Sequence, residues 1–191
     1  MPVVLACVSG SCEASAGRRR APLDVDRCPF LSHRSCSLHI RNIVSGMETL
    51  PLIHRGPRRA DIVGLLEGSA LPTSDLTDKD MTDFFYVGPA TAPVGIVGLQ
   101  FYGSAALLRS LVVTSPHRAR GLGQRLVEHA EQHARERGVA TVYLLTTTAE
   151  AFFRSRGYRV TPRESAPPAI RCTPEFAGLC PATSAFLSKR L

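Results

Sequence analysis

The stretch Arg118-Ala-Arg-Gly-Leu-Gly123 separates an apolar run, Leu107 to Val113, from a helical pattern that begins at Gly121. A near-continuous run of Leu and Val is typical of a strand that is covered on both faces. The chain must then turn sharply into the helix, and Gly121 and Gly123 stand at that turn, where a side chain would keep a ligand away from the backbone. We therefore expect the first helical turn to lie open to a ligand.

The expected ligand is an anion, because the first N–H groups of a helix have no intrahelical acceptor and the helix dipole favours negative charge there. The pattern is not a Walker P-loop, since no Gly-Lys-Ser/Thr follows, and it is not a dinucleotide fingerprint, since the third glycine is missing. A different phosphate-binding loop is therefore predicted. Its members are Arg118, Arg120, Gly121, Leu122, Gly123 and Gln124.

Periodicity places further elements after this loop. We expect a helix over Gly121–Arg137, a strand over Thr141–Leu145, a short helix over Ala149–Arg156 that ends at Gly157, and a last strand over Thr183–Leu187. Left exposed, that last strand would allow pairing between subunits and so a homodimer. Before the loop, a short strand, a helix and two strands are expected.

Local signals refine two of the helices. In the long helix, residues 122, 126, 130 and 134 form one apolar stripe, whereas the charged residues, including Glu131, are expected to face solvent. Glu131 and Arg135 form an i,i+4 pair. The sequence Thr147-Thr-Ala-Glu150 is a predicted capping box for the short helix.

The ordered set of strand, Arg-x-x-Gly-x-Gly loop, helix, strand and short helix ending in Gly157-Tyr158 resembles the GCN5-related N-acetyltransferase (GNAT) superfamily. Three further segments are similar to its arsenic-resistance N-acetyltransferase-like branch, and the resemblance covers roughly Thr49 to Leu191. It implies an α/β fold with a central mixed β-sheet flanked by helices on both faces. It also implies acetyl-CoA as cosubstrate and a small amine as acceptor. The three segments are Leu107–Val113, Leu144–Thr148 and Glu175–Pro181.

The resemblance also implies site residues. Members of this superfamily carry a bulge in the strand that bears the residues corresponding to Leu111–Val113, where that strand parts from the next one. The resemblance implies that backbone N–H groups near Leu111 and Val113 are left free for the cosubstrate, and Val112 between them is an expected contact. Thr148 is a further expected contact. The expected catalytic candidates are Glu175 and Tyr158, but Phe153 stands where many members have a tyrosine acid, which puts the return of a proton to the coenzyme thiolate in question.

Two arginines are candidates for binding the acceptor. Arg109 lies inside an apolar strand and must have a partner there, which is either a carboxylate of a neighbouring element or an anionic group of the substrate. Together with Arg171 it would suit an anionic amino acid such as the arsinothricin- or phosphinothricin-like compounds that the resemblance suggests. Cys172 and Cys180 are interpreted as packing residues, with binding of trivalent arsenic as the alternative.

Composition limits the other possibilities. The chain has 191 residues, 44% of them hydrophobic, and a net charge of +7, and no apolar run approaches the roughly 20 residues of a membrane span. Residues 1–47 hold four of the six cysteines and no sustained period, so we expect a disordered or non-native extension before a domain over 48–191. The cysteine spacing contains no repeated CxxC pair, so no metal is predicted. Without a signal-peptide pattern, the expected location is the cytoplasm.

Two rival functions stay open. The first is a catalytically degenerate GNAT domain that binds coenzyme A or an acyl-CoA as a sensor, which Phe153 and the lack of an obvious base would explain. The second is a role in protein or nucleic-acid acetylation or binding, based on the positive charge. It is disfavoured because the predicted domain contains no basic stripe with interleaved aromatic residues.

Overall fold

A computed structural model gives the fold of residues 51–191. The predicted extension over residues 1–47 and the domain boundary beside it lie outside the described residues and stay predictions. Within residues 51–191, the expected strands and helices occur in the expected order, and one short helix, Pro168–Arg171, occurs in addition.

Seven strands form one mixed sheet in the order β1-β2-β3-β4-β5-β7-β6. Neighbours pair antiparallel, except for β4 and β5, which are parallel. The predicted fold class is therefore confirmed. The strands are β1 (Ile53–Arg55), β2 (Phe84–Val87), β3 (Gly95–Tyr102), β4 (Ala105–Val113), β5 (Thr141–Thr146), β6 (Arg159–Val160) and β7 (Ala185–Arg190).

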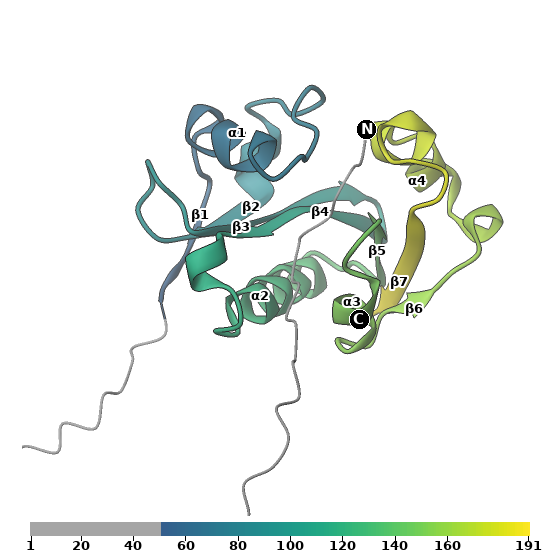
Figure 1. Cartoon of the computed structure of the whole chain (residues 1–191). Helices are drawn as coiled ribbons and strands as arrows, with labels where there is room; N and C mark the ends of the chain where they lie inside the picture. Colours follow the sequence, from purple (N-terminus) through teal and green to yellow (C-terminus); the bar gives the residue numbers. More distant parts are fainter. Residues whose placement is uncertain (1–50) are drawn as a thin grey trace, which may run out of the picture. The chain divides into compact units, whose positions relative to one another are not determined.

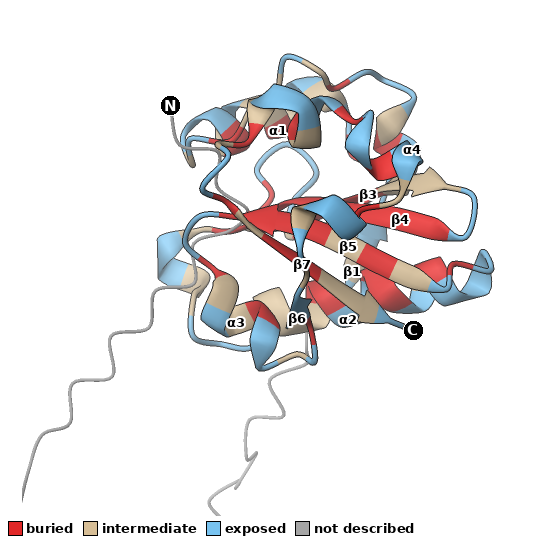
Figure 2. Cartoon of the chain, turned by 90° about the vertical axis from the view of Figure 1, so that its right-hand side faces the viewer, coloured by how far each residue is buried: buried red, intermediate tan, exposed pale blue. Residues whose placement is uncertain are grey.

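Helices cover both faces of the sheet (Figure 1). The upper face carries α1 (Arg59–Glu67) and α4 (Pro168–Arg171), and the lower face carries α2 (Leu122–Glu136) and α3 (Glu150–Arg154). Figure 2 shows the central strands buried between these two layers, and all nine residues of β4 are buried. Strand β4 therefore needs apolar residues on both sides, which explains its continuous Leu and Val run.

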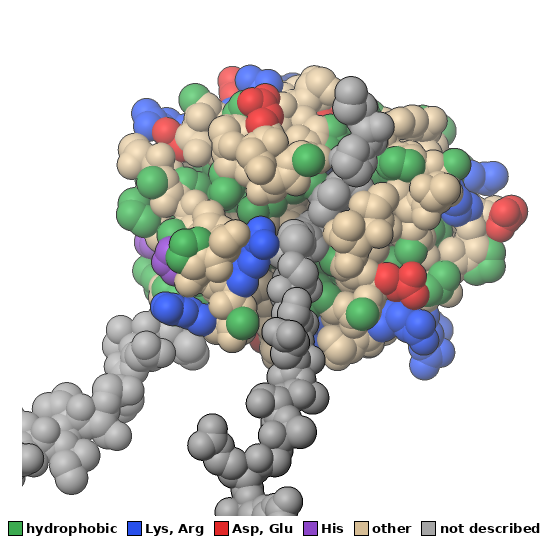
Figure 3. Space-filling model, viewed as in Figure 1, with side chains coloured by type: hydrophobic (Ala, Val, Ile, Leu, Met, Phe, Trp, Pro, Cys, Tyr) green, Lys and Arg blue, Asp and Glu red, His purple; other side chains and the backbone are tan. Residues whose placement is uncertain are grey.

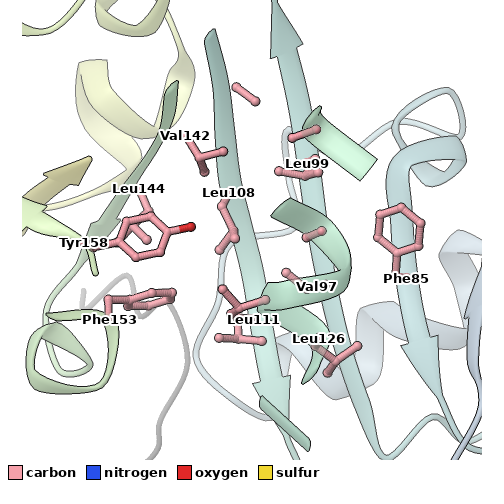
Figure 4. Close-up of a cluster of buried hydrophobic side chains, with 14 of the residues drawn as sticks. Phe85, Val97, Leu99, Leu108, Leu111, Leu126, Val142, Leu144, Phe153 and Tyr158 are labelled. Carbon is pink, nitrogen blue, oxygen red and sulfur yellow. The ribbon is translucent and has the colours of Figure 1, made fainter. Parts of the chain in front are cut away.

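The apolar side of α2 packs into the hydrophobic core on the lower face of the sheet. Its predicted apolar stripe packs against residues of β3, β4 and β5, as part of the cluster drawn in Figure 4. The expectation for Glu131 is wrong: the side chain is only 3% exposed, and its Oε2 accepts a bond from Lys189 Nζ at 2.6 Å. The predicted pair with Arg135 exists as a longer contact of 3.8 Å. Glu131 lies one turn after Val127 and so shares its buried flank.

Other local expectations also need correction. The short helix starts at Glu150 with Ala149 at the N-cap, whereas the predicted capping box has Thr147 at that position. The Ala149 N–H donates to Thr146 Oγ1 at 2.9 Å. Strand β7 is not an edge, because it pairs with β5 on one side and with β6 on the other, which removes the basis for the homodimer. Sequence periodicity also missed α4, which is only four residues long.

One irregularity of the sheet lies beside the loop. Across from β3, Ile96 pairs with Val112 but Gly98 pairs with Arg109, so β4 holds one extra residue, and Ser110 has a φ of +55°. The bulge changes which side chains point down, so that Leu111 and Val113 join the lower-face core. The bulge expected from the resemblance is therefore present.

Candidate functional site

A cavity of about 300 Å³ lies at the N-terminus of α2. Its wall combines the end of β4, the loop before α2, the first turn of α2 and side chains from α3. Of the predicted loop residues, all line it except Arg120, which is exposed and absent from the wall. The lining residues are Val113, His117, Arg118, Ala119, Gly121, Leu122, Gly123, Gln124, Phe152 and Arg156.

The backbone at this end of α2 is suited to an anion. Gly121 is the N-cap with a φ of +75°, a left-handed conformation that favours glycine. The first helical bond joins Arg125 N–H to the Gly121 carbonyl at 3.1 Å, so the N–H groups before Arg125 precede the intrahelical ladder. These donors and the helix dipole point at the cavity, as the sequence predicts.

Two arginines contribute charge to the cavity. Arg118 is fixed by its Nε, which donates to the Val113 carbonyl at 2.8 Å and so leaves the outer guanidinium nitrogens for a ligand. Arg156 comes from the turn after α3, and sequence reasoning missed it. Its signal was only its place beside the predicted Gly157 turn. A cavity with amide donors and two guanidinium groups fits a phosphate-bearing ligand.

Strands β4 and β5 part beside this cavity. Their parallel register pairs run from Ala105–Thr141 to Leu107–Tyr143, and β5 then continues in pairing with β7. From Leu108 onward, the β5 side of β4 has no register partner among the described strands. The backbone of Leu111, Val112 and Val113 therefore lies along an open seam that ends at the cavity, since Val113 belongs to both.

The upper face holds a second group of site candidates, which we call the carboxylate cluster: Asp75, Arg109 and Glu175. Arg109 is only 2% exposed and directs Nη1 to both carboxylates, and its Nη2 donates to Asp75 Oδ1 at 3.0 Å. Asp75 comes from the segment after α1, and Glu175 begins a π-helical turn, Glu175–Leu179. The alternative of a structural partner for Arg109 is therefore present in the structure.

The carboxylate cluster contains two carboxyl groups, of Asp75 and Glu175, but only one guanidinium group, of Arg109. Burial raises the pKa of Glu175, and Arg109 opposes this without cancelling it. Burial alone would lower the pKa of Arg109, but the hydrogen bond that Arg109 donates to Asp75 and the charge of Glu175 raise it. Glu175 Oε2 is buried and has no hydrogen-bond partner among the described residues. Glu175 therefore holds a proton more readily than an ordinary glutamate.

Tyr158 lies away from both groups. It is 2% exposed, packs edge-on against Phe153 at 5.3 Å between ring centres, and directs its hydroxyl into the lower-face cluster (Figure 4). Burial raises its pKa well above the ordinary value, and the Glu131 carboxylate adds to this. Tyr158 therefore keeps its proton. It is not among the residues that line the cavity.

The remaining candidates are at the surface or in the core. Thr148 is exposed two residues after the end of β5, with its N–H 3.4 Å from Thr146 Oγ1, and Arg171 is exposed at the end of α4. Cys172 is exposed, whereas Cys180 is buried, and burial together with Glu175 raises the pKa of its thiol to about 12.

Across residues 51–191, no group of three or more His, Cys, Asp or Glu side chains is arranged to hold a metal ion. None of the helices described there has the length and apolar character to cross a membrane.

Comparison with known proteins gives one relative by sequence and several by structure. An uncharacterised N-acetyltransferase of Chlorobaculum tepidum is 36% identical over 93 residues, which span 48% of this chain and 59% of that protein. The chain thus matches about three fifths of that relative's length.

Solved structures share the fold at low sequence identity. N-acetylglutamate synthase of Neisseria gonorrhoeae, complexed with coenzyme A and N-acetyl-glutamate, aligns with a TM-score of 0.63 and 19% identity, over 74% of this chain and 35% of that one. Rv2747 of Mycobacterium tuberculosis, also in complex with coenzyme A, aligns with a TM-score of 0.60 and 17% identity, over 74% and 99% of the two chains.

The sequence itself matches the model of the acetyltransferase (GNAT) family over residues 61–158. This range runs from α1 to the residue before β6 and includes the bulged strand, the loop and the helix that form the cavity. It covers just over half of the chain, and this chain therefore belongs to the acetyltransferase (GNAT) family.

Proposed function

We propose that this protein is an acetyl-CoA-dependent N-acetyltransferase that acts on a small amine. The observation that carries the proposal is that one cavity lies at the N-terminus of α2 and reaches Val113, where the open seam between β4 and β5 ends. A ligand with a diphosphate at one end and a thioester at the other needs both features. Several structures with the same fold contain coenzyme A, which supports this choice.

The proposed reaction is direct transfer. The neutral amine nitrogen attacks the thioester carbonyl carbon, the C–N bond forms, the C–S bond breaks, and the thiolate leaves. Backbone N–H groups near Leu111 and Val113 are the proposed donors to the carbonyl oxygen, because the N–H of Val112 between them faces β3. Each such donor contributes about 3 kcal/mol of transition-state stabilisation.

Glu175 is the proposed acceptor of the amine proton. Its raised pKa brings it closer to neutrality, where a general base is most effective. Phe153 has no hydroxyl and is fully buried, so the thiolate takes its proton from water in this proposal. Tyr158 is the second catalytic candidate, and its burial away from the cavity makes it the weaker one.

For the acceptor, an arsinothricin- or phosphinothricin-like amino acid is the specific candidate, with a role in arsenic resistance. Its support is the sequence resemblance. Because Arg109 already contacts two carboxylates, the anionic group of such an acceptor would depend more on Arg171, which is exposed on the same face of the sheet. Thr148 is a proposed contact of the cosubstrate at the seam.

Phe153 also favours a second candidate, a sensor that binds coenzyme A without turnover. The nucleic-acid rival has less support. On the face shown in Figure 3, Lys and Arg side chains are interspersed with Asp and Glu and do not gather into one stripe.

The test is calorimetric titration of acetyl-CoA into the full chain, followed by assays of free thiol release with a panel of amines that includes both amino acids. Micromolar binding with turnover is expected. Gly123→Val places a branched side chain among the donor amides, so we expect at least about 100-fold weaker binding by a variant that unfolds normally. Equal affinity of variant and parent would remove the cavity assignment, and binding without turnover would favour the sensor.

A further inference from the structure

The chain after α3 fixes the backbone of Arg156. The Arg156 N–H donates to the Phe153 carbonyl at 2.9 Å, and the Gly157 N–H donates to the Arg154 carbonyl at 3.0 Å. Gly157 then reverses the chain with a φ of +88°. This turn holds Arg156 at the edge of the cavity and leaves only its side chain to move.

The guanidinium of Arg156 is partly positioned and partly without partners. Its carbon lies 4.8 Å from the centre of the Phe152 ring, and its Nη1 is 3.2 Å from Ser155 Oγ. Its Nε is buried and has no acceptor among the described residues. A buried N–H without an acceptor is costly, so the group is prepared for a partner that the chain itself does not supply.

The cavity indicates the chemistry of that partner. Arg156 and Phe152 line the same cavity as Gly121, Gly123 and Arg118, so the guanidinium borders the space that the α2 amides face. An anion there would meet donors from the first turn of α2 and from the turn after α3. Planar guanidinium groups that are stacked on an aromatic ring suit phosphate oxygens, which accept two parallel N–H bonds.

Arg120 offers a contrast within the same molecule. Sequence spacing placed it in the phosphate loop, but it is exposed and does not line the cavity. Arg154 is also exposed, and its Nη1 lies 3.4 Å from Glu150 Oε1. Arg120 and Arg154 therefore carry the same charge as Arg156 and are near it in the sequence or the loop, but neither lines the cavity.

We propose that Arg156 is a phosphate-binding residue of the cosubstrate site and takes the role that sequence spacing gave to Arg120. The inference rests on the proposed function, because the phosphate is one of those of coenzyme A. The Nε–H and Nη–H groups of Arg156 bind either the diphosphate of coenzyme A or the 3′-phosphate of its ribose. These two sources share one chemistry and are separable by experiment.

The test compares the dissociation constants of coenzyme A and dephospho-coenzyme A, which lacks the 3′-phosphate, for the full chain and Arg156→Gln. We expect about 10- to 100-fold weaker binding of coenzyme A by Arg156→Gln. Equal weakening for both ligands assigns Arg156 to the diphosphate, and weakening confined to coenzyme A assigns it to the 3′-phosphate. Arg120→Gln and Arg154→Gln, the matched controls, are expected to stay within about threefold of the parent.

Arg156→Lys keeps the charge but loses the planar fork, so its affinity should fall between those of the parent and Arg156→Gln. Thermal unfolding of each variant establishes that the fold is intact. Parent-like affinity of a folded Arg156→Gln, or losses as large in Arg120→Gln and Arg154→Gln, would overturn the assignment while leaving the proposed function in place. Failure of the parent itself to bind coenzyme A would remove both.

Discussion

Each face of the sheet buries one group of ionisable side chains, and the two groups differ in charge balance. The lower face has a lysine cluster of Glu131, Lys189 and Tyr158, in which one carboxylate meets one ammonium group beside a neutral phenol. On the upper face, the carboxylate cluster sets two carboxylates against one guanidinium.

The difference separates a structural role from a functional one. The lysine cluster joins α2 to β7 and pairs its one carboxylate with an ammonium group, although Glu131 Oε1 and the Tyr158 hydroxyl are buried without a hydrogen-bond partner among the described residues. In the carboxylate cluster, segments from opposite ends of the domain meet at β4 directly before the bulge, and one carboxylate remains in excess. Keeping an extra buried negative charge destabilises a fold, and such perturbed groups concentrate at functional sites.

The largest effect is expected from Arg109→Met. Removing the guanidinium leaves two buried carboxylates without a cation, which costs about 3–5 kcal/mol of unfolding free energy. The loss should shrink as the pH falls, because burial raises the pKa of Glu175 and this carboxylate then takes up a proton. Urea unfolding at pH 7 and pH 5 measures it. A loss below about 1 kcal/mol, together with a raised acceptor KM, would instead make Arg109 a substrate clamp.

A smaller loss is expected from Lys189→Met. It leaves Glu131 without its closest cation, but the Lys189 side chain is 22% exposed and Arg135 stays within 3.8 Å of Glu131. Water and Arg135 therefore soften the penalty to about 1–3 kcal/mol. Arg190→Met, at the exposed neighbouring position, is the control and should change stability by less than about 0.5 kcal/mol. Equal losses in the two variants would contradict a structural role for the lysine cluster.

Sequence alone predicted β4 and the start of α2, because both depend on residues that are close together in the chain. The run Leu107–Val113 lies within β4, and the glycines mark the start of α2, because strand periodicity and backbone freedom are properties of neighbouring residues. The loop assignment followed from the same signals.

What the sequence could not predict depends on partners far along the chain. Glu131 was assigned to solvent because its partner, Lys189, is 58 residues away, and Asp75 is 34 residues from Arg109. The bulge was expected only from the resemblance, because nothing local marks it: Ser110 adopts a left-handed conformation without being glycine. The sequence did not place Arg156 at the cavity, because spacing within the loop before α2 says nothing about which side chains the turn after α3 brings there.

The smallest change in stability, with the opposite sign, is expected from Glu175→Gln. The amide removes the excess negative charge and leaves Arg109 balanced by Asp75, so at pH 7 the variant should match or exceed the parent by less than about 1 kcal/mol. The pKa of Glu175 is raised above 4.5 in the folded protein. The stability that its proton contributes is therefore complete below pH 4.5 and is lost as the pH rises through the folded value, so the advantage of the variant should grow with pH.

The acetyltransferase activity of Glu175→Gln then distinguishes a catalytic role of Glu175 from a structural one. A proton acceptor that becomes an amide should lower kcat/KM at pH 7 by about 100-fold and remove the acidic limb of the pH profile. Glu131→Gln is the matched control on the other face: it should weaken the fold, because Lys189 loses its charged partner, yet leave the pH profile unchanged. Loss of stability without loss of activity in Glu175→Gln would place both clusters in the same structural class and leave the proton to water, since a neutral amine can react without a protein base.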